Sequence, residues 1–149
     1  MPRRPRCELP PSGPYHLTAR GVDRSLIVRD EHDWEALRDL VLAARGRFGL
    51  RYDVFCLMRS HFHLVVDAWL PAVSKGMHWI SGTYAGRFNR RWGRTGHLFE
   101  NRFVAWVPRD EAHWEETCRY VLDNPVRAGL CESASDWPWS GGRFLRRRT

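Results

Sequence analysis

The sequence has no apolar run near the roughly 20 residues that a transmembrane helix needs, so no membrane span and no membrane partner are expected. Its four cysteines include no C-x-x-C pair and show no spacing typical of a disulfide framework or a structural zinc module. The basic amino terminus is not followed by the apolar segment of a secretory signal peptide. These absences predict a cytoplasmic protein with reduced thiols.

Lysine is almost absent too, because Lys75 is the only lysine among 24 lysines and arginines. The formal net charge is nevertheless +7, since the sequence holds only 17 aspartates and glutamates. The guanidinium of arginine can donate two hydrogen bonds to the oxygens of one phosphate and can stack on bases. A basic chain rich in arginine and tryptophan therefore favours a nucleic-acid partner. A GC-rich genome would also favour arginine over lysine, but it would not produce the net charge.

The length of 149 residues predicts a single domain spanning 1–149, enough to bury about two-thirds of the surface of the unfolded chain. No internal repeat or linker divides it. Residues 1–14 form a basic, proline-rich arm, and residues 125–149 are predicted to form an irregular basic tail.

Between the arm and the tail, the spacing of the hydrophobic residues predicts a succession of strands and helices. Strands are predicted at 15–20, 52–58, 61–67 and about 102–107, and helices at about 31–48, 71–94 and 110–123. The second and third strands form a hairpin with a turn at Arg59-Ser60. This order predicts an α+β fold, a ferredoxin-like split βαβ repeat with an antiparallel sheet and an added carboxy-terminal helix.

A histidine pair, His61 and His63, opens the third predicted strand. Residues two apart in a strand share a face, so both imidazoles would lie on one side while Phe62 faces the core. Two neutral imidazoles one strand step apart can bind a divalent ion. Such a pair is also often structural, held by carbonyl groups or water, and the spacing alone leaves both interpretations open.

Tyr120 lies in the last predicted helix but away from its apolar stripe. Each residue of a helix turns it by about 100°, which places Tyr120 roughly 130° around the helix from the middle of the stripe. Asn124 lies on the same helical face, four residues on. A phenol can attack phosphorus when a cation or a base assists it. The alternatives are an exposed surface tyrosine, and an Asn124 that only ends the helix before Pro125.

Other basic and aromatic residues are candidates for contact with DNA. Arginines can hold backbone phosphates, and an aromatic side chain can stack on a base, which is worth about 1–3 kcal/mol per base. The alternative is a set of ordinary solvated side chains. The candidates are Arg3, Arg4, Arg6, His16, Arg20, Arg87, Arg90, Arg91, Trp92, Arg94, Arg102 and Arg127.

Several segments together resemble the REP-associated tyrosine transposases, a branch of the one-tyrosine His-hydrophobic-His (HUH) single-strand endonucleases. The matching segments are 15–21, 56–58, 61–63, 88–91, 96–103, 119–120, 124–130 and 137–140. A lone His-x-His motif is weak evidence for this family. The same pair followed by Tyr-x-x-x-Asn-Pro-Val-Arg-Ala-Gly-Leu is strong evidence for it. Two departures are Arg59-Ser60, where the family usually has Pro-Asn, and the glycines at 76, 82 and 86.

The resemblance implies a metal-dependent transposase and endonuclease that binds hairpins in single-stranded DNA. It would nick beside them through a 5′-phosphotyrosine intermediate and rejoin the strands. His61 and His63 would hold Mg²⁺ or Mn²⁺, Asn124 would be a third ligand, and Tyr120 would be the nucleophile. A monomer or homodimer associated with the nucleoid is expected.

Two other functions remain open at this stage. The first is a non-catalytic module of ferredoxin-like fold that binds single-stranded DNA or RNA, although no strand shows the paired aromatic pattern of RNA-recognition domains. The second is a zinc hydrolase that uses His61 and His63 with Cys56 or Cys118, although no carboxylate stands at motif spacing to act as its base.

Overall fold

The computed structural model describes residues 8–100 and 102–147. These residues form a five-stranded sheet in the order β4-β1-β3-β2-β5, and all neighbouring strands are antiparallel. The strands are β1 (Tyr15–Arg20), β2 (Arg51–Leu57), β3 (His61–Asp67), β4 (Val104–Trp106) and β5 (Ser140–Gly141). The first four strands have the order expected of the ferredoxin-like repeat.

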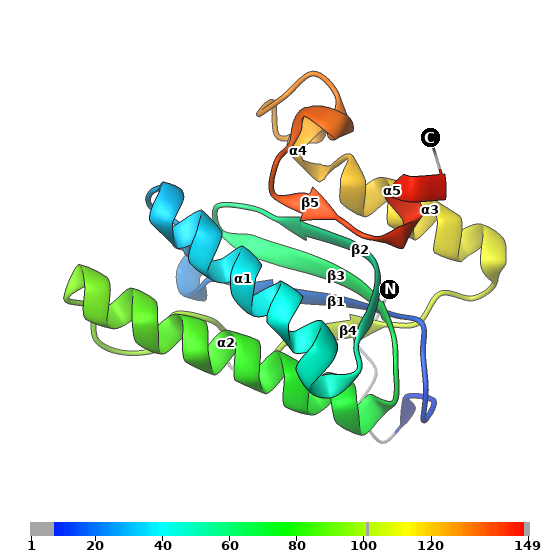
Figure 1. Ribbon diagram of the computed structural model, residues 1–149, viewed down its shortest axis with the longest axis horizontal. Helices are drawn as coiled ribbons and strands as arrows, with labels where there is room; N and C mark the ends of the chain where they lie inside the picture. The colour runs from blue at the N-terminus through cyan, green and yellow to red at the C-terminus, as the bar shows by residue number, and fades with distance from the viewer. Residues whose placement is uncertain (1–7, 101, 148–149) are drawn as a thin grey trace.

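The helices cover both faces of this sheet (Figure 1). They are α1 (Glu31–Phe48), α2 (Leu70–Trp92), α3 (Glu111–Leu122), α4 (Asn124–Arg127) and α5 (Arg143–Arg147), with short 3-10 turns at Val22–Arg24 and Ala134–Asp136. The helices α1 and α2 pack side by side on one face, and α3 lies on the other (Figure 1). The α+β architecture and the added helix are therefore as the sequence predicted.

Local signals explain where the helices begin and end. The carboxylates of Asp30 and Asp110 accept the backbone N–H groups of Asp33 and His113, which caps α1 and α3. Gly49 ends α1 in the left-handed conformation, with φ at 69°. No helix among the described residues has the length and apolar character needed to cross a bilayer.

The sheet is buried on both faces, and the alternation along β3 sorts its side chains between them. Phe62 and Leu64 lie in the core beneath α1 and α2. Val65 lies in the second core, where the apolar stripe of α3, including Cys118 and Val121, packs. His61 and His63 stand on the same side of the strand as Val65, so α3 covers the face that carries the histidines.

The prediction of an irregular tail over 125–149 is wrong, because the segment contains α4, β5 and α5. Strand β5 pairs Gly141 with Phe55 of β2, and a Cβ at position 141 would lie 2.8 Å from the Phe55 ring. Glycine is required by this close approach. A strand of two residues is too short to show the alternation on which sequence prediction depends.

Asp33 joins α1 to the end of α2. It is 2% exposed, and its carboxylate accepts hydrogen bonds from Trp92 Nε1 at 2.9 Å and from Arg91 Nη1 at 2.8 Å. Arg91 also bonds Asp30, with Nη1 and Oδ1 2.5 Å apart. The buried carboxylate of Asp33 thus links α1 to α2 by accepting hydrogen bonds from a charged guanidinium and a neutral indole.

Replacing Asp33 by Ala should lower the free energy of unfolding by about 2 to 3 kcal/mol, because the Trp92 N–H and the Arg91 guanidinium lose a buried acceptor. Urea unfolding followed by circular dichroism measures this change in the free energy of unfolding. The control is Asp39→Ala, an exposed carboxylate of the same helix whose loss should change the stability by less than about 0.5 kcal/mol. Equal effects of the two substitutions would contradict this role of Asp33.

Candidate active site

Three imidazoles gather on the α3 face of the sheet. Strand β1 is in register with β3 so that Thr18 lies opposite His63 and Arg20 opposite His61. The ring centroids of His61 and His63 are 5.0 Å apart, and those of His16 and His63 are 5.1 Å apart. The shared face of the histidine pair is confirmed, and β1 adds His16 to it.

His63 is the most enclosed of the three, with 6% of its surface exposed. Its Nδ1 lies 2.9 Å from His16 Nε2 and 3.1 Å from Thr18 Oγ1. His61 has a different neighbour, because its Nδ1 lies 3.2 Å from Ser60 Oγ in the β2–β3 turn. Polar groups of the fold therefore contact Nδ1 of both rings, which leaves Nε2 as the nitrogen that can face a ligand.

Burial keeps these imidazoles neutral. Loss of solvent lowers the pKa of His16 to about 4 and that of His61 to about 4. It also lowers the pKa of His63 well below its usual value, and positive neighbours, including Arg20, add to the effect. Neutral imidazoles offer the lone pair that a metal ion needs.

Tyr120 opens onto the same cavity as His63. The cavity has a volume of about 440 Å³. One wall is formed by His16, Thr18, Arg20 and His63 of the sheet, and the opposite wall by His113, Glu116, Thr117 and Tyr120 of α3. Tyr120 is 56% exposed, in agreement with its predicted position away from the apolar stripe. His61 lies beside His63 without lining this cavity.

Arg127 lies against Tyr120. Its guanidinium carbon is 3.8 Å from the centroid of the phenol ring, and its Nη2 donates to the Tyr120 carbonyl oxygen at 2.8 Å. A cation over an aromatic face is attracted by the ring quadrupole. The residue predicted as a DNA contact is thus part of the surroundings of the candidate nucleophile.

Asn124, the predicted third metal ligand, begins α4, and its carbonyl oxygen accepts the Ala128 N–H at 3.0 Å. It does not line the cavity that holds His63 and Tyr120. Glu116 does, one helical turn before Tyr120, and helical spacing counted backwards from Tyr120 could have found it. Among the described residues, no three His, Cys, Asp or Glu side chains are grouped so that they could hold a metal ion.

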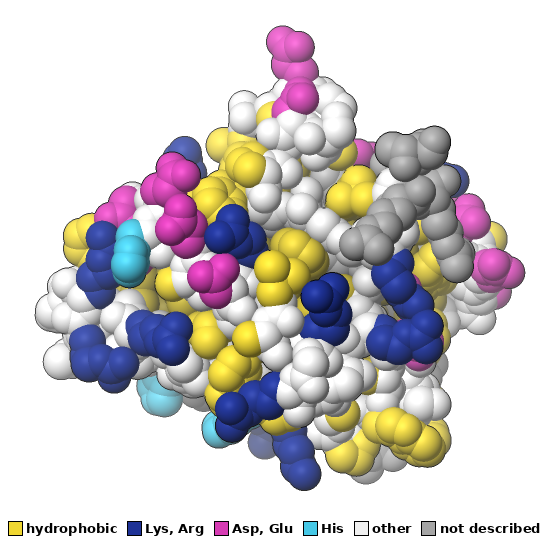
Figure 2. All heavy atoms as spheres, viewed as in Figure 1, with side chains coloured by type: hydrophobic (Ala, Val, Ile, Leu, Met, Phe, Trp, Pro, Cys, Tyr) yellow, Lys and Arg dark blue, Asp and Glu magenta, His cyan; other side chains and the backbone are white. Residues whose placement is uncertain are grey.

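The other predicted DNA contacts differ in their surroundings. Arg20 lines the candidate site, while Arg87 and Arg90 are exposed near the end of α2. Arg91 and Trp92 bond the carboxylates of α1 described above, and Arg94 bonds Asn89 Oδ1 at 3.0 Å. Arg3, Arg4 and Arg6 lie outside the described residues. Figure 2 shows basic side chains in several separate groups on the face of α1 and α2.

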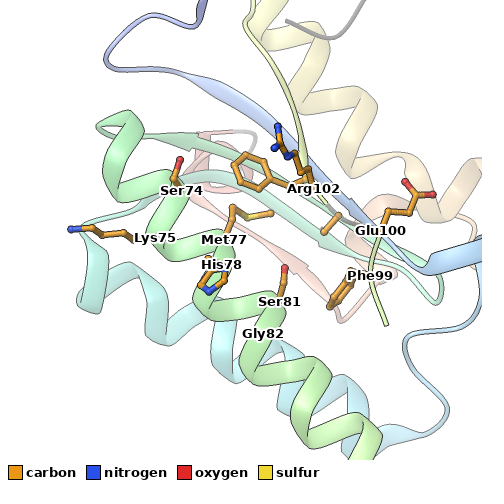
Figure 3. Close-up of a pocket in the computed structure, with 11 residues that line it drawn as sticks. Ser74, Lys75, Met77, His78, Ser81, Gly82, Phe99, Glu100 and Arg102 are labelled. Atoms are coloured by element: carbon orange, nitrogen blue, oxygen red, sulfur yellow. The ribbon is translucent and has the colours of Figure 1, made fainter. Parts of the chain in front are cut away.

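Arg102 lines a second cavity of about 390 Å³, between α2 and the segment that leads into β4 (Figure 3). Met77 points toward this segment, and Lys75 points away from it along the helix (Figure 3). Ala19 of β1 also lines the cavity, and its side chain belongs to the core on the α1 and α2 face. The second cavity is thus distinct from the one that contains Tyr120.

The cysteines of the zinc alternative are buried in the apolar cluster beneath α3. Burial raises the pKa of the Cys56 thiol to about 12 and that of the Cys118 thiol to about 12. Zinc binds the thiolate rather than the thiol, so this environment disfavours both residues as ligands.

Comparisons with known proteins bear on the family and the fold of the chain. The family model described as Transposase IS200 like matches residues 12–124. A solved REP-associated tyrosine transposase bound to a REP hairpin is similar in fold, with a TM-score of 0.72 and 19% identity over 94% of this chain and 81% of that chain. A candidate transposase from Deinococcus radiodurans R1 has a TM-score of 0.53 and 17% identity, over 81% of this chain and 95% of that chain.

A comparison with curated proteins found no significant match. The matched family model nevertheless spans most of the chain, from before β1 to the end of α3. It therefore includes every element that lines the cavity of His63 and Tyr120. On this match, the chain belongs to the family of IS200-like transposases.

Proposed function

We propose that this transposase nicks and rejoins single-stranded hairpin DNA through a covalent bond between Tyr120 and a 5′ phosphate. The observation that carries the proposal is the common cavity of Tyr120 on α3 and His63 on β3. A phenol, a neutral imidazole and the guanidinium of Arg20 face one space that a phosphodiester can enter. Because one chain supplies both walls, the proposal needs no tyrosine from a second subunit.

The residues present fit a divalent metal ion. His61 and His63 would hold Mg²⁺ or Mn²⁺, because both rings are neutral and their contacts leave Nε2 to face a ligand. Two imidazoles make a weak site for a hard cation, which supports a site completed by phosphate oxygens and water. When bound, the ion would polarise the scissile phosphate and stabilise the charge that develops on it.

The protein's own part in the reaction is nucleophilic attack and positioning. The phenol oxygen of Tyr120 forms a bond to phosphorus and gives its proton to solvent, with which this exposed side chain is in contact. The bond from phosphorus to the 3′ oxygen breaks, and that oxygen takes up a proton and leaves as a hydroxyl group. Attack by a 3′-hydroxyl on the phosphotyrosine reverses these changes and rejoins the strand.

The proposed substrate follows from charge and from the likeness in fold. The chain has a net charge of +7, and exposed arginines stand near the end of α2 and at the candidate site. The similar transposase is bound to a REP hairpin. A hairpin with a single-stranded flank would place its stem on basic surface and its flank in the cavity.

Tyr120→Phe should bind a hairpin oligonucleotide as the wild type does and form no covalent adduct, because only the attacking oxygen is lost. Denaturing gels with a labelled hairpin and Mn²⁺ detect the adduct, and mobility shifts report binding. The matched control is Arg119→Ala, an exposed neighbour on α3, which should keep adduct formation. A wild type that shifts the hairpin without ever forming an adduct would favour the non-catalytic binding module.

His61→Ala and His63→Ala should each reduce Mn²⁺-dependent adduct formation by at least about 100-fold, because the ion loses one of two protein ligands. Chelation should abolish the adduct in the wild type, and added Mn²⁺ should restore it. His97→Ala, which removes an exposed histidine, is the control. Cutting that resists the chelator would contradict the metal site.

Arg127→Ala should slow adduct formation by about 10-fold while weakening hairpin binding only a few-fold, because a cation over an aromatic ring is worth about 0.5–2 kcal/mol. Arg127→Lys should recover part of the rate, since it restores the charge without the planar fork. Single-turnover rates and binding titrations separate the two effects. An equal loss in binding and in rate would assign Arg127 to the DNA alone.

A further inference from the structure

We infer that His16 is a positioning residue for His63, whose proton on Nδ1 it accepts so that Nε2 is presented to the ligand. The inference rests on the proposed function for the identity of that ligand, but the contact itself is independent of it. His16 Nε2 lies 2.9 Å from His63 Nδ1, the ring centroids are 5.1 Å apart, and the ring planes are inclined by 29°.

The fold brings His16 to this place through the sheet register. Thr18 is directly opposite His63 across the β1–β3 ladder, and His16 stands two residues away on the same face of β1. The other neighbour of β1 is β4, where Trp106 is opposite His16. Its ring packs on that of His16 with centroids 5.0 Å apart. His16 is thus held between an indole on one side and His63 on the other.

This placement gives His16 a different role from the DNA contact that the sequence suggested. Its Nε2 is directed at His63 rather than at open solvent, and its ring is partly buried under Trp106. Thr18 Oγ1 lies 3.1 Å from the same Nδ1, so two side chains of β1 converge on one ring nitrogen of β3. Two polar partners on one atom fix the orientation of the ring more tightly than one would.

The chemistry requires one tautomer of each ring. If His63 donates from Nδ1, its Nε2 carries a lone pair and can bind a cation, and His16 must then carry its own proton on Nδ1. In the reverse arrangement His16 donates from Nε2, and His63 has its proton on Nε2 and cannot bind there. Groups that orient metal-binding imidazoles in this way typically change metal affinity by about 10- to 100-fold when they are removed.

A competing arrangement would make His16 a direct ligand that shares a cation with His63. The absence, among the described residues, of a three-member His, Cys, Asp or Glu group able to hold a metal opposes this arrangement. The ring planes of His16 and His63 are inclined by only 29°, whereas those of His61 and His63 meet at 89°. Because the N–H and the lone pair of an imidazole lie in its ring plane, the small angle and the short nitrogen–nitrogen distance suit a hydrogen-bonded positioning contact between His16 and His63. The perpendicular pair consists of the two proposed ligands.

The first measurement needs no metal, and its result is read on the wild-type protein. Nitrogen-15 spectra of the imidazole side chains report which ring nitrogen carries the proton, and assignment uses single substitutions of the seven histidines. The expected result is His63 protonated on Nδ1 and His16 with an unprotonated Nε2. A wild-type His63 protonated on Nε2 overturns the inference, whatever the fate of the proposed reaction.

The second measurement is Mn²⁺ affinity by electron paramagnetic resonance, with hairpin oligonucleotide present and Tyr120→Phe as background so that no adduct forms. His16→Phe keeps a ring against Trp106 but removes the acceptor, and should weaken Mn²⁺ binding by about 10- to 100-fold. His16→Gln keeps a polar group that can reach Nδ1, and should remain within a few-fold of the background protein. The control, His97→Phe, removes an exposed histidine that does not line the cavity and should have little effect.

Each outcome decides the inference. Wild-type affinity in folded His16→Phe would overturn it. Equal losses in His16→Gln and His16→Phe, together with a signal from three coordinated imidazoles, would instead make His16 a ligand. If the background protein binds no Mn²⁺, the proposed function fails, and the tautomer of His63 alone still supports or overturns the positioning contact.

Discussion

The register of β1 against β3 is the constraint on which the candidate site depends. It sets Thr18 opposite His63 and turns His16, Thr18, His61 and His63 toward α3. A slip of one residue would turn one strand's polar side chains into the core beneath α1 and α2. The apolar residues that alternate with them, Leu17, Phe62 and Leu64, are fully buried, so their packing holds the register. The core thus positions the site.

The same arrangement explains the electrostatics of the site. Three imidazoles are placed where solvent is scarce, which lowers the pKa of each, and Arg20 lowers the pKa of His61 and His63 further. The neutral rings can then be hydrogen-bonded or coordinated without repelling one another. Arg20 adds a positive charge to the lining of the cavity, which suits the proposed phosphodiester.

Periodicity predicted the parts of the molecule that repeat locally. The shared face of the histidine pair, the exposed Tyr120 and the succession of strands and helices from 15 to 123 follow from patterns within a few residues. Periodicity did not predict the partners of Arg91, because Asp30 and Asp33 are about 60 residues away in the sequence. The positions of Arg127 over Tyr120 and of His16 beside His63 likewise depend on three-dimensional packing, which spacing alone does not specify.

The short strand β5 also determines which edge of the sheet stays open. By pairing with Phe55 and Cys56 it occupies hydrogen-bonding groups of β2 that would otherwise be offered to a strand from another molecule. Trp137 donates its indole N–H to Leu57 and extends this cover along β2. The carboxy-terminal segment therefore covers part of the β2 edge, and without it that edge would present unpaired backbone N–H and C=O groups to other chains.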